Sequence, residues 1–175
     1  TLSSSSAASD VYKRQGTNGV QAMDLCGRKL ASKGGAAIQA FFKIVGEDIA
    51  SAKEDEALKD IAEMLEKALG QQQAATMWFM NNAMQNPNHL GAGAHHYMHI
   101  MGIVTLGWMW LRMAKAAKQA LAADTGDKAY YEAKLTSARY YAERYLPDAG
   151  ALRRKLEAGS ESMMALGEEA FATAA

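Results

Sequence analysis

Apolar residues recur along most of the chain at spacings of three and four, which places them on one face of an α-helix. The clearest case is 36–52, where the apolar stripe comprises Ile38, Phe41, Phe42, Val45 and Ile49. In the segment 18–33, one face of the predicted helix carries Val20, Met23, Gly27 and Leu30. The remaining predicted helices span 57–85, 87–123, 128–146 and a short segment that starts at 147.

Glycine, asparagine and proline mark the ends of these predicted helices. Gly34 and Gly35 follow the first, because glycine readily takes the left-handed backbone that ends a helix. Asn86 and Pro87 form a helix start, in which Asn caps the first turn and Pro occupies it. Gly70 lies inside the third helix and favours a kink there. The predicted fold is all-α, an antiparallel bundle of about five to six helices.

The segment 87–123 is apolar almost all round between Tyr97 and Leu111. A transmembrane helix needs about 20 predominantly apolar residues. This run is shorter, contains His99 and ends at Arg112. A central helix that is buried on several sides therefore explains the pattern better than a membrane span.

Composition restricts the partners and the compartment. Hydrophobic residues make up 49% and charged residues 22%, which predicts a folded main body. The net charge is zero, so the basic surplus that nucleic-acid binding requires is absent. Cys26 is the single cysteine, which excludes an internal disulfide, and we expect it to be a packed thiol. The first residues lack the apolar region of a secretory signal, and we predict a cytoplasmic location.

Residues 1–15 differ in composition from the rest of the chain. They open with a run of Ser and Ala and show neither a helical nor a strand period. We interpret them as a translated adapter sequence, which does not contribute to the fold. The alternative is a natural disordered arm. The predicted organisation is thus a non-native or disordered tail at 1–15, followed by one helical region at 16–175.

The most distinctive local sequence is 16–30, Gly-Thr-Asn-Gly-Val-Gln-Ala-Met-Asp-Leu-Cys-Gly-Arg-Lys-Leu. It resembles the segment that opens the last part of the acyl-CoA dehydrogenases, where flavin, thioester and catalytic base meet. Residues 86–114, with Leu-Gly-Trp-Met-Trp near their end, and residues 138–147 are similar to a long bacterial subgroup. That subgroup includes the methylmercaptopropionyl-CoA dehydrogenases. The resemblance covers about residues 16–170 and implies a C-terminal fragment of such an enzyme.

This resemblance implies roles for the first residues of the motif. In the family, a Glu before Gly-Thr removes the α-proton of the acyl chain, but Gln15 stands there in this chain. An amide is not a base near neutral pH, so we expect the fragment itself to be inactive. Gly16 matches the position that lies against the substrate thioester, whereas Thr17, Asn18 and Gly19 match positions along the flavin. Many relatives carry Gln at the place of Gly19, and Thr17 and Asn18 could instead simply cap the first helix.

The resemblance also implies partners for the parent enzyme. These are FAD as the cofactor, an acyl-CoA substrate, an electron-transfer acceptor and a homo-oligomeric assembly. Because most flavin contacts would come from other domains, we do not expect the fragment to bind FAD tightly. The apolar stripe of 36–52 would pack on those domains, so we expect it to be partly uncovered here.

Three histidines are the rival functional feature. His95 and His99 are four residues apart and His96 and His99 three, so two of them can face one ligand. A metal site needs further ligands, and no Cys or carboxylate lies nearby at helical spacing. We therefore predict no metal site. The alternatives to an enzyme fragment are a non-catalytic helical scaffold or interaction module, and a bundle that binds metal through these histidines.

Overall fold

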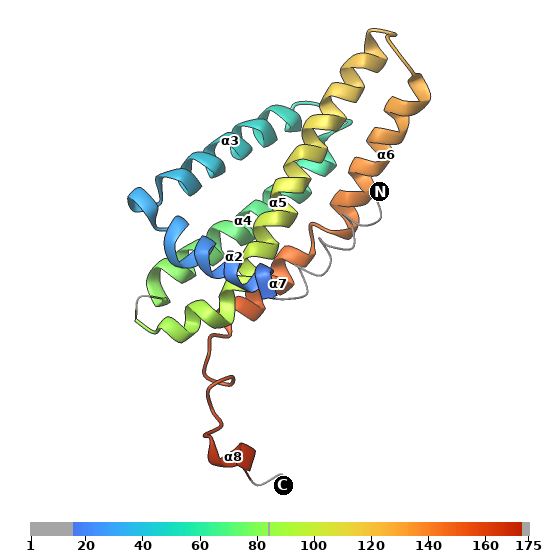
Figure 1. Cartoon of the computed structure of the whole chain (residues 1–175). Helices are drawn as coiled ribbons and strands as arrows, with labels where there is room; N and C mark the ends of the chain where they lie inside the picture. The colour runs from blue at the N-terminus through green and yellow to red at the C-terminus, as the bar shows by residue number, and fades with distance from the viewer. Residues whose placement is uncertain (1–15, 84, 173–175) are drawn as a thin grey trace, which may run out of the picture.

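The structure is a computed structural model that describes residues 16–83 and 85–172 (Figure 1). The α-helices are Asn18–Asp24 (α2), Ala36–Lys53 (α3), Lys59–Asn82 (α4), Pro87–Ala122 (α5), Lys128–Arg144 (α6), Asp148–Glu157 (α7) and Glu169–Ala172 (α8). No strand occurs among the described residues. The predicted all-α fold is therefore confirmed. The predicted tail at 1–15 lies outside the described residues.

Helix α5 is the central element of the fold, because α2, α3, α4, α6 and α7 all pack against it (Figure 1). Gly93 of α5 lies so close to α4 that a Cβ atom there would be 2.9 Å from the Phe79 ring. Fourteen residues later, a Cβ atom on Gly107 would be 3.1 Å from Leu65. The later residue of α5 thus contacts the earlier residue of α4, so α4 and α5 run antiparallel. The predicted central helix is thus confirmed.

No helix in the described part of the chain is long and apolar enough to cross a membrane.

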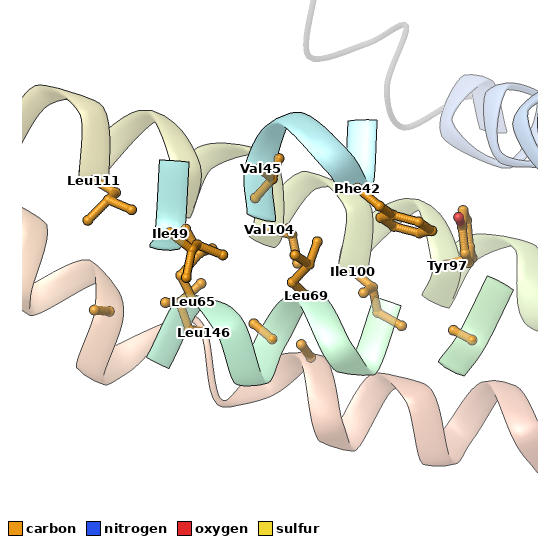
Figure 2. Packing of buried hydrophobic residues seen from close by; sticks show 14 of the residues in the cluster. Phe42, Val45, Ile49, Leu65, Leu69, Tyr97, Ile100, Val104, Leu111 and Leu146 are labelled. Carbon is orange, nitrogen blue, oxygen red and sulfur yellow. The ribbon is translucent and has the colours of Figure 1, made fainter. Parts of the chain in front are cut away.

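Buried apolar side chains from all the helices α2 to α7 form one continuous core, part of which Figure 2 shows. Their removal from water supplies the main stabilisation, about 25 cal/mol per Å² of apolar surface. The residues labelled in the figure are Phe42, Val45, Ile49, Leu65, Leu69, Tyr97, Ile100, Val104, Leu111 and Leu146.

The apolar stripe of α3 belongs to this core. Ile38, Phe42 and Val45 are at most 8% exposed. Phe41 is partly buried and packs edge-on against Trp108 of α5, with the ring centroids 6.0 Å apart. The stripe was expected to be partly uncovered, but only Phe41 keeps partial exposure, because α4 and α5 of the same chain cover the rest.

Local chemistry determines the helix ends, as the sequence predicted. The Asn86 side chain accepts a hydrogen bond from the backbone N–H of Asn88 at 3.0 Å, and Pro87 is the first residue of α5. Gly34 and Gly35 have φ of +66° and +79°, in the left-handed region, immediately before α3.

Two parts of the predicted helices differ in the structure. Helix α4 continues without a break through Gly70, because residues on both sides of it, Leu69 and Gln72, are held in the core. The predicted helix at 18–33 is α-helical only to Asp24 and continues as a π-helix over Leu25–Lys29. A single π-turn of this kind often occurs near functional sites.

Candidate functional site

The Gly-Thr-Asn-Gly motif lies at the start of α2, which packs across α5 (Figure 1). Gly16 has a φ of +86°, a conformation that residues with a side chain rarely adopt. A Cβ atom on Gly16 or Gly19 would meet no described atom within 4 Å. The backbone at both positions is therefore open to approach from outside. Gln15 lies outside the described residues.

Thr17 and Asn18 differ in their surroundings. Thr17 is half-buried and Asn18 is exposed. Within the described residues, the Thr17 side chain makes no capping hydrogen bond to α2, so the simple helix-cap interpretation does not hold for Thr17. Asn18 forms one wall of a groove. The motif residues thus adjoin a surface that belongs to helices far away in the sequence.

This surface is a shallow groove of about 380 Å³ between the start of α2, the middle of α5 and the end of α6. No local pattern in the sequence indicates this groove, because its walls are residues about 80 and 120 positions after Asn18. It is mostly apolar and is lined by Asn18, Met98, His99, Gly102, Ile103, Leu106, Tyr141 and Tyr145.

Two tyrosines hold α6 against this groove. The Tyr141 hydroxyl donates a hydrogen bond to the Ile103 carbonyl at 3.1 Å, and burial raises the pKa of Tyr141 to about 12. The rings of Tyr141 and Tyr145 are stacked, with their centroids 4.9 Å apart. The wall formed by α6 is therefore fixed by a directional contact as well as by packing.

Helix α2 and the π-helix are anchored by one buried face. Cys26 is 6% exposed, its thiol lies 3.8 Å from the Ala94 carbonyl of α5, and burial raises its pKa to about 12. The prediction of a packed thiol is confirmed. On the exposed side, Asp24 contacts Arg28 at 2.6 Å and Lys29 at 3.0 Å. Hydrogen bonds from Arg28 and then Lys29 lower the pKa of Asp24 to about 2.

His95, His96 and His99 all belong to α5, and His99 lines the groove. His95 and His99 are exposed, and their ring centroids are 4.3 Å apart. His96 is half-buried, and its Nδ1 atom has no hydrogen-bond partner among the described residues. In the part of the chain that the structure describes, no three His, Cys, Asp or Glu side chains gather to hold a metal ion. Among residues 16–83 and 85–172, the metal-binding alternative has the two facing rings of His95 and His99 and no third ligand.

We expect His96 to make the fold less stable at acidic pH. Burial lowers the pKa of His96, and the neighbouring His95, Lys155 and His99 lower it further. Because the folded pKa lies below the unfolded one, protons bind the unfolded chain more tightly. The contribution of neutral His96 to the free energy of unfolding is fully present above the pKa of His96 in the unfolded chain. It declines as the pH falls through that value towards the folded pKa. The urea concentration at the midpoint of unfolding should be lower at about pH 5 than at about pH 8, and this decrease should be smaller in His96→Gln. An equal fall in both proteins would contradict this assignment.

Comparison with known proteins decides the family. The family model described as Acetyl-CoA dehydrogenase C-terminal like matches residues 36–167. The chain belongs to the acyl-CoA dehydrogenase family. The match covers the helices from α3 to α7. It begins after the Gly-Thr-Asn-Gly motif, so the proposed roles of the motif residues stay predictions.

Individual acyl-CoA dehydrogenases match over nearly the whole chain. A broad-specificity linear acyl-CoA dehydrogenase of Mycobacterium tuberculosis is 31% identical over 90% of this chain and 27% of its own length. The 3-methylmercaptopropionyl-CoA dehydrogenase of Ruegeria pomeroyi is 27% identical over 86% of this chain and 26% of its own length. A butyryl-CoA dehydrogenase of Syntrophomonas wolfei is 25% identical over 90% of this chain and 26% of its own length. The chain thus spans about a quarter of the length of the curated relatives it matches.

Proposed function

We propose that residues 16–175 are the C-terminal helical part of a flavin-dependent enzyme that introduces an α,β double bond into an acyl-CoA thioester. The observation that carries this proposal is the presence of the Gly-Thr-Asn-Gly motif at the exposed start of α2, in a chain of this family. The proposed cofactor of the parent enzyme is FAD.

Desaturation requires a base for the α-proton while a hydride leaves the β-carbon. FAD, when bound, supplies the acceptor for that hydride. We assign the backbone of Gly16 to contact with the substrate thioester, because its left-handed conformation and missing side chain permit the substrate to approach closely. Thr17 can donate its hydroxyl, and the exposed Asn18 amide can donate and accept hydrogen bonds. Gly19 leaves the surface beside them open.

The fit of these residues to FAD and substrate is incomplete. Gly16, Asn18 and Gly19 are exposed on an open surface, whereas ligand sites bury most of their ligand. The remaining contacts, and the base that Gln15 cannot replace, would come from the rest of the parent enzyme. We therefore propose that this chain by itself neither binds FAD tightly nor oxidises acyl-CoA. For the parent enzyme we propose a cytoplasmic homo-oligomer that passes its electrons to an electron-transfer acceptor.

The test uses the longer natural polypeptide that contains residues 16–175. We expect the purified parent to carry FAD and to lose flavin absorbance when an acyl-CoA is added without oxygen. Free CoA is the control, because it has no acyl chain to desaturate. A parent that carries no flavin, or whose flavin stays oxidised with acyl-CoA substrates of several lengths, would contradict the proposed function.

A further inference from the structure

We infer that the groove between α2, α5 and α6 is the docking site for the catalytic part of the parent enzyme, an inference that rests on the proposed function. The groove is uncovered within the described chain, although it presents large apolar side chains. Leu106 is 55% exposed and Tyr145 is 45% exposed, while Met98 and Ile103 are partly buried in the groove. Exposed apolar side chains that lie together, rather than singly, are candidates for an interaction surface.

The form of the groove favours a polypeptide over a small ligand. Small-molecule sites are concave and enclose most of their ligand, whereas this groove is shallow. None of the described residues that line it is a lysine, arginine, aspartate or glutamate. The matching face should therefore be apolar and uncharged, with polar groups placed only opposite Asn18, His99 and the tyrosine hydroxyls.

Gly102 leaves the middle of the groove without a side chain. Glycine weakens the interior of a helix relative to alanine, so a helical glycine needs a reason. Gly93 and Gly107 of the same helix have one, because a Cβ atom would be 2.9 Å and 2.6 Å from neighbouring side chains. A Cβ atom on Gly102 would meet no described atom within 4 Å. Among the described residues, Gly46, Gly70 and Gly91 are equally open, so Gly102 is distinguished by its place in the groove, where a partner can lie directly against the backbone of α5.

The identity of the partner follows from the position of the groove and the length of the relatives. The chain spans 27% and 26% of the first two relatives, so most of such an enzyme lies outside it. Asn18 in the groove wall is two residues from Gly16, where the catalytic part would join the chain. A covalent link at this distance gives a high effective concentration, so a modest apolar surface is enough for stable docking.

Hydroxyl-radical footprinting of the isolated chain and of the full-length parent tests the inference. We expect labelling of Leu106 and Tyr145 to fall several-fold in the parent. Equal labelling in both proteins would overturn the inference. Labelling of the isolated chain that falls as its concentration rises would also overturn it, because the occupant would then be a second copy. The footprint does not depend on turnover, so a parent that protects these residues but lacks flavin would contradict only the proposed function.

A matched pair of variants separates docking from folding. Gly102→Leu fills the groove, and Gly70→Leu makes the same change in the interior of α4, where a Cβ atom also meets nothing within 4 Å. Leucine is a better helix former than glycine, so neither change should lower the thermal midpoint of the isolated chain. In the parent, only Gly102→Leu should restore the labelling of Tyr145. Unchanged protection of Tyr145 in the Gly102→Leu parent would overturn the inference.

Discussion

Replacing Phe79 by alanine is expected to lower the free energy of unfolding by about 3–5 kcal/mol. The ring is 3% exposed and lies between α4 and α5. It packs edge-on against Tyr97, with the centroids 5.5 Å apart, and fills the space beside Gly93. Gly93 has no side chain that could fill the vacated volume. Truncation would therefore leave a cavity, and the lost contacts would add to the lost burial.

Urea unfolding followed by far-ultraviolet circular dichroism measures this effect. Met77 lies on the same helix, is 58% exposed and provides the control. Met77→Ala should change the stability by no more than about 0.5 kcal/mol, as is usual for exposed positions. Similar losses in the two variants would show that the Phe79 ring is not a central packing element.

Helix boundaries were predictable where short-range chemistry sets them. The predicted segment 36–52 became Ala36–Lys53, and 87–123 became Pro87–Ala122. In the second case the capping side chain and the proline that fix the start are adjacent in sequence. The central position of α5 was also predictable, since a helix that is apolar on all sides must be covered on several.

Tertiary contacts were not predictable, because periodicity identifies apolar faces but not what covers them. On the predicted face of the first helix, Leu30 is buried, but Val20 and Met23 are 67% and 42% exposed. The face that packs in the core carries Ala22 of α2 and Cys26 of the π-helix, whose small side chains let this segment approach α5 closely. The uncovered apolar surface was likewise expected on α3, whereas the groove lies between α2, α5 and α6.

The candidate site shows the same limit. The motif at residues 16–19 was found through its resemblance to a family, not through any pattern of spacing. The structure adds the exposed backbone of Gly16 and Gly19 and the groove beside Asn18. Leu106 and Tyr145 belong to helices that meet Asn18 only after folding, so no local signal in the sequence connects them with the motif.

The position before Gly16 should control turnover when the rest of the enzyme is present. We consider a fusion in which the catalytic part of the Ruegeria pomeroyi relative replaces residues 1–14, with either Gln or Glu at position 15. Loss of a general base typically slows a reaction by about 10²–10⁴-fold. The fusion with Gln15→Glu should therefore oxidise acyl-CoA faster than the fusion with Gln15 by about that factor.

In the isolated chain the same substitution should restore nothing. A base accelerates the reaction only when substrate and hydride acceptor are held beside it, and such positioning can contribute about 7–11 kcal/mol of the barrier. The described residues offer an open motif and a shallow groove, which cannot hold acyl-CoA and FAD together. Flavin bleaching by an acyl-CoA, measured without oxygen and with FAD added, is the assay for both chains. Bleaching with the isolated Gln15→Glu chain would show that positioning of substrate and flavin does not require the catalytic part. Bleaching with the unmodified chain would show that Gln15 does not prevent the reaction.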